Sequence, residues 1–166
     1  MRDDLKWLYP DKEVSEEVIK RFAENLKIVY PNDYIQCVKK YGGAIVEPSS
    51  FDVKNNEEGR VFGSLCSFDK NATSNIYKTY SNLKSSLPNQ IIPFADDPAG
   101  NKICFDYKNH EDNPIVVFWD HEESENRETL IEEGLSVQEA DEVMRESIYY
   151  IADSFTSFLD MLYKEE

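Results

Sequence analysis

Four short apolar segments in the middle of the chain limit the folds open to it more than any other feature. Each is rich in β-branched or aromatic residues and is bounded by Gly, Pro, Asn or Asp: VFGSLCSF (61–68), QIIPFA (90–95), NKICFDY (101–107) and PIVVFWD (114–120). Runs of this length and composition are typical of β-strands separated by turns. Between the first two, apolar residues recur at helical spacing at Ile76, Tyr80, Leu83 and Leu87. We therefore expect a sheet with a helix crossing between two of its strands.

Further helices are expected on both sides of this region. SEEVIKRFAENL places its apolar residues on one helical face behind Ser15, a typical N-cap, and YPNDYIQCVKKYGG predicts a second helix that ends at its glycine pair. Near the C-terminus, SIYYIADS predicts a last strand, and DSFTSFLDMLYK predicts a helix capped by Asp153 or Ser154. In SVQEADEVMRE, Ser136 and Glu139 have the spacing of a capping box, which predicts a short exposed helix.

The charge of the chain is negative and unevenly distributed. The formal net charge is -15, and residues 111–146 hold 13 acidic residues against only two arginines, Arg127 and Arg145. A field of this sign repels phosphate backbones and anionic lipids, and it speeds encounters with basic molecules. We therefore expect neither nucleic acid nor a membrane as a direct partner, and we expect a basic protein instead.

Length and cysteine content indicate one cytoplasmic domain. A chain of 166 residues with 13% aromatic residues can bury one core, so we expect a single domain over residues 1–166 with a short lead at 1–13. The cysteines are odd in number, far apart and in apolar contexts, which indicates reduced, buried thiols: Cys37, Cys66 and Cys104. No apolar signal-peptide region and no run of about 18 apolar residues is present. The expected location is the cytoplasm.

The segment IIPFADDPAGNKICFDYKN (91–109) admits two interpretations. In a metal-dependent nuclease, an Asp and an acid-x-Lys pattern on an adjacent strand hold Mg²⁺ and polarise water, and Asp97, Asp106 and Lys108 match this pattern. Alternatively, residues 96–101 form a hairpin turn in which an Asp side chain accepts hydrogen bonds from backbone amides and Gly100 or Asn101 takes a positive φ. The turn is favoured because the pattern is short and the chain is strongly acidic, and the nuclease is kept as the alternative.

The segment FWDHEE (118–123) raises the question of a metal site or a recognition surface. Neighbouring strand residues point to opposite faces, so Asp120, His121 and Glu122 do not converge on a metal ion unless the chain turns there. The sequence therefore predicts no metal, no cofactor and no catalytic residue. By the same alternation, one aromatic of the pair Phe118 and Trp119 is expected outward, beside acidic side chains, which suits a protein interface. The alternative, packing in the core, is the more common role of such aromatic residues.

The order of the motifs resembles a known family. YPNDYIQCVKKYGG, IIPFADDPAGNKICFDY, PIVVFWDHE and IADSFTSFLDML follow one another as in the SUKH superfamily, specifically the branch related to fungal cell-wall synthesis regulators of the Smi/Knr type. In bacteria this branch is dominated by immunity proteins of polymorphic toxin systems. The sequence departs from the usual pattern at Tyr30 and Tyr41, where Leu and Asn are common, and in the acidic segment 136–146, which lengthens the usual tail.

The resemblance implies an α+β fold with a twisted, largely antiparallel sheet flanked by helices, and no catalytic activity. It also implies that the protein binds a cognate toxin, often a nuclease, and blocks its active site or substrate groove. An alternative within the same resemblance is a regulatory scaffold that binds several endogenous proteins. We expect a basic toxin to contact the residues around the hairpin turn and the end of the last central strand: Asp96, Asp97, Trp119, Asp120, Glu122 and Glu123.

Overall fold

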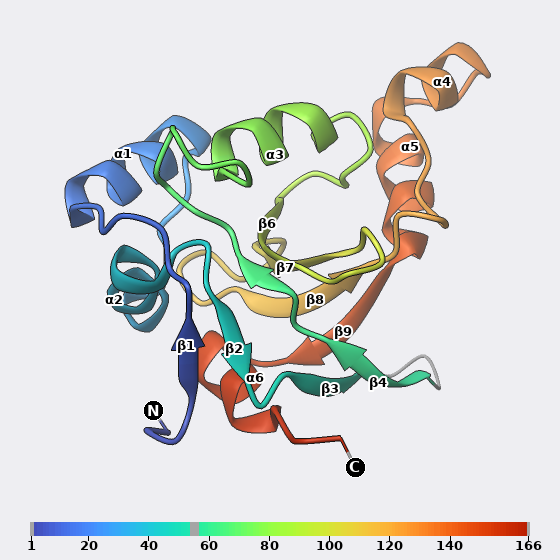
Figure 1. Ribbon diagram of the computed structural model, residues 1–166. Helices are drawn as coiled ribbons and strands as arrows, with labels where there is room; N and C mark the ends of the chain where they lie inside the picture. The colour runs from blue at the N-terminus through green and yellow to red at the C-terminus, as the bar shows by residue number, and fades with distance from the viewer. Residues whose placement is uncertain (1, 54–56, 166) are drawn as a thin grey trace.

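A five-stranded antiparallel sheet forms the centre of the molecule in the computed structural model, which describes residues 2–53 and 57–165 (Figure 1). The strands lie in chain order: β5 (Ser64–Leu65), β6 (Ile91–Asp96), β7 (Lys102–Asp106), β8 (Ile115–Trp119) and β9 (Ile148–Ala152). Each pairs with the next in antiparallel register. The predicted strands and the α+β, largely antiparallel architecture are therefore confirmed.

Two smaller antiparallel ribbons accompany the central sheet. Strand β1 (Lys6–Leu8) pairs with β2 (Ile45–Glu47), and β3 (Ser50–Val53) pairs with β4 (Glu57–Val61). The backbone amide of Leu65 in β5 donates to the carbonyl of Ala44 at 2.9 Å, which joins the first ribbon to the central sheet. The segment expected to be a lead thus contributes strand β1.

Local capping chemistry sets the ends of the N-terminal helices. Helix α1 (Glu16–Leu26) begins at Ser15, whose hydroxyl accepts from the amide of Val18, as predicted. Helix α2 (Asn32–Tyr41) is followed by Gly42 and Gly43, and the φ of Gly43 is +84°. A left-handed residue reverses the chain just after a helix, and glycine adopts that conformation without a Cβ clash.

Helices and loops cover both faces of the central sheet. On one face, Phe105 packs with Tyr34 of α2 and Phe155 of α6 (Phe155–Met161), and the three side chains are fully buried. On the other face, Cys104 and Trp119 pack in a smaller cluster against the segment that follows α3 (Ile76–Leu83). Side chains alternate along β7, so Ile103 and Phe105 lie in the first cluster and Cys104 in the second.

The three cysteines are free and buried, as predicted. Burial raises the pKa of the Cys37 thiol to about 12, and it raises the pKa values of Cys66 and Cys104 as well. Thiols in such surroundings are inert because the reactive thiolate is not formed near neutral pH. Within residues 2–53 and 57–165, no helix is both long enough and apolar enough to cross a membrane.

Candidate functional site

Residues 96–101 form the predicted hairpin turn, and Asp97 holds it together. Its Oδ1 accepts hydrogen bonds from the amides of Ala99 at 2.9 Å and Asn101 at 2.8 Å, and its Oδ2 accepts from the side-chain amide of Asn101 at 3.0 Å. Gly100 has a φ of +89°, which the sequence anticipated. Since Asp97 is only 6% exposed and its oxygens are occupied by the turn, its carboxylate is a structural acceptor.

The end of β8 docks onto this turn. The amide of His121 donates to Oδ1 of Asn101 at 3.0 Å, and its ring Nε2 lies 2.9 Å from the carbonyl oxygen of Ala99. The next residues form a second turn, in which Asp120 accepts from the amide of Glu122 at 2.9 Å. The structure therefore brings the segments 96–101 and 119–123, which the sequence singled out separately, to one end of the sheet.

The six residues expected to contact a partner differ in accessibility. Asp120 is half-buried, and Glu122 and Glu123 are exposed, although Glu123 also accepts a hydrogen bond from the hydroxyl of Tyr149. The carboxylate of Asp96 forms an ion pair with Lys102 at 2.7 Å, with 22% of its side chain exposed. The candidate surface at this end of the sheet is therefore smaller than expected.

The expectation of an outward Trp119 is wrong. Its side chain is 2% exposed and packs with Leu87, Ile91, Cys104 and Val117. Alternation along β8 does direct Phe118 and Trp119 to opposite faces, but both faces are covered, so neither ring reaches the surface. A partner thus cannot use Trp119 as an exposed aromatic anchor.

The three residues of the nuclease alternative do not assemble into a site. In the β6–β7 hairpin, Asp96 pairs with Lys102 and Ile91 pairs with Asp106, so Asp97 and Asp106 lie at opposite ends of the ladder. Lys102 and Asp106 are four positions apart on the strand, roughly 13 Å along its length. Asp106 is instead clamped by Arg145, with both guanidinium-to-carboxylate distances at 3.0 Å. In the described parts of the chain, no three His, Cys, Asp or Glu side chains form a potential metal site.

The most acidic part of the chain folds into a helical hairpin, here called the arm: α4 (Arg127–Glu132), α5 (Val137–Met144) and the turn between them. Asn126 caps α4, and the predicted capping box of α5 is present, with Ser136 and Glu139 bonded reciprocally at 3.0 and 3.1 Å. The arm also has a small core of its own, formed by Leu130, Ala140 and Met144. Helix α4 was not predicted from the sequence.

Both arginines of the arm are used for its attachment to the body. Arg127 donates to the carbonyls of Lys84 at 3.2 Å and Leu87 at 2.8 Å. Arg145, directly after α5, binds Asp106 and also donates to the carbonyl of Asn89 at 3.2 Å. Because these cations face inward, the exposed charges of the arm are all carboxylates: Glu128, Glu132, Glu133, Glu139 and Glu142.

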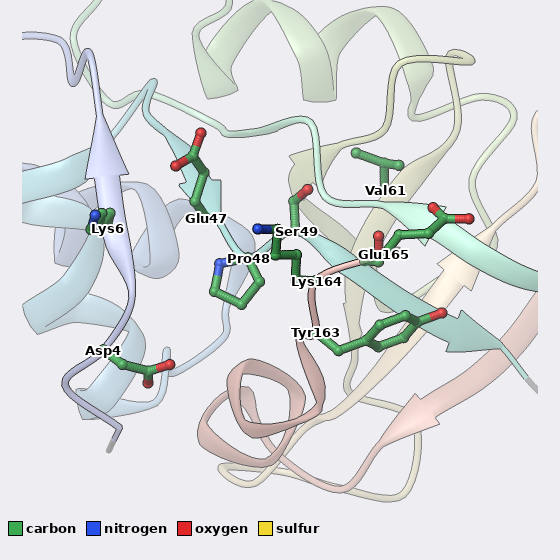
Figure 2. Close-up of a pocket in the computed structure, with 10 residues that line it drawn as sticks. Asp4, Lys6, Glu47, Pro48, Ser49, Val61, Tyr163, Lys164 and Glu165 are labelled. Atoms are coloured by element: carbon green, nitrogen blue, oxygen red, sulfur yellow. The ribbon is translucent and has the colours of Figure 1, made fainter.

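A separate groove lies on the opposite side of the molecule, between the β1–β2 ribbon and the C-terminal segment (Figure 2). Its volume is about 620 Å³, which is within the usual range for small-molecule pockets. Lys6 and Glu47 lie on the ribbon side, and Lys164 and Glu165 lie on the opposing segment (Figure 2). The lining offers both signs of charge in similar number, so the groove does not select a ligand by charge.

Comparison with known proteins places the chain in a family. The sequence model of the SMI1/KNR4 family (SUKH-1) matches residues 13–161, a range that includes α1, the central sheet, the arm and α6. A curated relative, the SPbeta prophage-derived uncharacterized protein YokK of Bacillus subtilis (strain 168), is 33% identical over 133 residues, which is 69% of this chain. The aligned region spans 65% of the length of that relative. The chain therefore belongs to the SMI1/KNR4 (SUKH-1) family.

Proposed function

We propose that this protein is a bacterial immunity protein that binds a cognate basic toxin in the cytoplasm and covers the toxin's active site or substrate groove. The observation that carries the proposal is the charge of the arm, whose exposed ionised groups are all acidic because both of its arginines are turned to the body. A nuclease must present a basic groove to nucleic acid, and an acidic protein surface competes for that groove.

The mechanism needs no chemical step from this chain. Complementary charges steer two proteins together, raising association rate constants from about 10⁵–10⁶ M⁻¹s⁻¹ to as much as about 10⁸–10⁹ M⁻¹s⁻¹ at low salt. Fast capture suits an immunity protein, since a toxin molecule that is bound late has already acted on its target. The separation of Asp97 from Asp106 and the clamp of Arg145 on Asp106 also favour binding over metal-dependent hydrolysis as the role of this region.

The proposal is tested in the producing organism. The purified protein is used as bait in a lysate, the column is washed at low and then at high salt, and the released proteins are identified by mass spectrometry. We expect one basic toxin domain in the high-salt fraction, because salt screens charge pairing. That domain is then expressed in a sensitive host, where co-expression of this chain restores growth.

Three outcomes contradict the proposal. Capture of several unrelated endogenous proteins, none of them toxic, indicates the regulatory scaffold. Capture of a toxin whose effect on growth is unchanged by co-expression shows that binding does not neutralise it. Cleavage of DNA or RNA by the purified chain with Mg²⁺, abolished by Asp106→Asn and unaffected by a further purification step, supports the nuclease.

A further inference from the structure

We propose that the tip of the arm is the part of this protein that docks on the basic toxin, with Ile131 and Val137 entering an apolar hollow on the toxin and the surrounding glutamates pairing with its basic rim. This inference rests on the proposed function and specifies the surface that performs it. It also moves the contact away from the end of β8, where Trp119 is buried and Asp97 is occupied by its turn.

The tip exposes two apolar side chains that lie outside the small core of the arm. Ile131 is 39% exposed and Val137 is 58% exposed, and they flank the turn that connects α4 to α5. The inward positions of the two helices are filled by other residues, the small core of Leu130, Ala140 and Met144. A side chain at Gly134, within the turn, would meet no atom within 4 Å of its Cβ, so this side of the turn is open.

The charge around these two side chains has one sign. Glu132 and Glu133 follow Ile131 directly, and Glu128 lies one helical turn before them. None of these three carboxylates has an ion pair or hydrogen bond within the described portion of the chain. Like charges at this spacing repel one another, and a basic surface relieves that repulsion when it docks.

The arm is a preformed element with capped helices and an anchored base. Its two helices are capped, and its base is fixed by Arg127 on the carbonyls of Lys84 and Leu87 and by Asp141, which accepts from the amide of Asn89 at 2.7 Å. In Figure 1, α4 lies at the outer end of the arm, away from the central sheet. A preformed, projecting element loses little conformational entropy on association.

These features indicate which class of partner the tip of the arm binds. Protein interfaces combine an apolar centre, from which water is excluded, with a polar rim. Here the centre is Ile131 and Val137 and the rim is acidic, so the complementary surface is a basic protein with an apolar hollow. A second copy of this chain is a poor occupant, because two acidic tips repel each other.

The inference is tested by site-specific photo-crosslinking with the toxin domain captured in the experiment above, made inactive by substitution. Benzoylphenylalanine is placed singly at Ile131 or Val137, and as matched controls at Val29 and Ile45, which are 56% and 40% exposed and lie on other faces. We expect a 1:1 covalent adduct from the two arm positions and none from the controls. Lysozyme, an unrelated basic protein, should give no adduct from any position.

Binding of the same toxin domain is then compared among variants. Ile131→Ser with Val137→Ser should weaken equilibrium binding by about tenfold or more. Glu132→Lys with Glu133→Lys should slow association at low salt by about tenfold, whereas the matched reversal of two exposed acids elsewhere, Glu13→Lys with Glu24→Lys, should have a much smaller effect. Unchanged thermal unfolding of each variant shows that the fold is intact.

The outcomes separate the inference from the function on which it rests. Adducts from Val29 or Ile45 with none from the arm overturn the inference and leave the immunity role standing. An adduct of two copies of this chain from the arm positions also overturns it, because the tip is then a self-association surface. If no toxin is captured at all, the proposed function fails, and the assignment of the tip fails with it.

Discussion

Replacing Arg145 with Met tests whether one ion pair holds the arm to the sheet. In the protein, its guanidinium makes two hydrogen bonds of 3.0 Å with the carboxylate of Asp106, whose side chain is 9% exposed. Met keeps the aliphatic stem and removes the charge. The carboxylate of Asp106 then keeps the hydrogen bond that the amide of Lys108 donates at 3.0 Å, but it loses the guanidinium of Arg145.

The size of the effect follows from burial. Removing one partner of a buried ion pair costs about 3–5 kcal/mol, because the other charge is left without compensation. Arg145 is 18% exposed, so water can partly replace it, and we expect the lower end of that range, about 3 kcal/mol. For a domain of this size, about 3 kcal/mol corresponds to a fall in Tm of about 6–12 °C.

Urea unfolding at pH 7, followed by circular dichroism, measures the change. A cycle that combines Arg145→Met with Asp106→Asn should give a coupling energy of about 2 kcal/mol, since both substitutions remove the same interaction. Arg21→Met is the matched control: Arg21 pairs with Glu17 at 2.7 Å on an exposed helix face, where such a pair contributes less than about 0.5 kcal/mol. Equal stability of the Arg145 and Arg21 variants would refute the reasoning.

Four further predictions concern the body and the arm. Tyr107→Phe should lower the free energy of unfolding by about 1 kcal/mol in urea titrations, because the carbonyl of Val29 loses the hydroxyl that donates to it at 2.8 Å. Ser136→Ala should lower the stability of α5 by about 1 kcal/mol through loss of the capping box. Relative to the unchanged protein, amide hydrogen exchange should become faster in α5 and stay the same in α1. A hydrogen bond from Gln36 lowers the pKa of Glu16, so the stability that this carboxylate contributes is complete above its ordinary pKa of 4.5 and is lost as the pH falls below that value. In Glu16→Gln, the free energy of unfolding should therefore depend less on pH in that range, as measured by urea titrations at several pH values. A thiol reagent at pH 8 should label the native protein slowly and the urea-unfolded protein at once, at the three buried thiols, Cys37, Cys66 and Cys104.

Local chemistry explains which parts of the fold could be predicted from the sequence. The hairpin turn follows from Asp97, whose side chain bonds amides only two and four residues away, and the start of α1 follows from Ser15, which bonds an amide three residues away. The alternation along β7 likewise depends on neighbouring residues alone. Interactions between residues a few positions apart leave a local sequence pattern, from which the structure can be predicted.

Long-range pairing explains what could not be predicted. Strand β1 pairs Trp7 with Val46, and no local pattern connects two segments so far apart in the chain. The burial of Trp119 depends on Leu87, which the chain reaches only after α3 and which covers the second face of the sheet. The pairing of Arg145 with Asp106 is also long-range. The sequence of the acidic segment therefore did not indicate which of its residues face the body of the protein.

The short helix α4 was missed for a different reason. It has six residues, too few to show a helical period, and its only local signal is Asn126, which caps it by accepting from the amide of Thr129 at 3.1 Å. The acidic surroundings of this segment indicated that it is exposed but did not define its structure. The candidate site at the tip therefore emerged from the structure.

The way the arm is attached has an evolutionary consequence. Its arginines lie at the two ends of the segment 127–145, where they bind backbone carbonyls and Asp106, and Asp141 adds a further anchor by accepting from the amide of Asn89. Substitutions at the exposed positions between the two arginines, which do not include Asp141, leave the sheet and its core untouched. Partner specificity can thus change through replacement of this one short segment while the rest of the domain is retained. Transplanting residues 128–144 between relatives should transfer recognition of a toxin from one to the other.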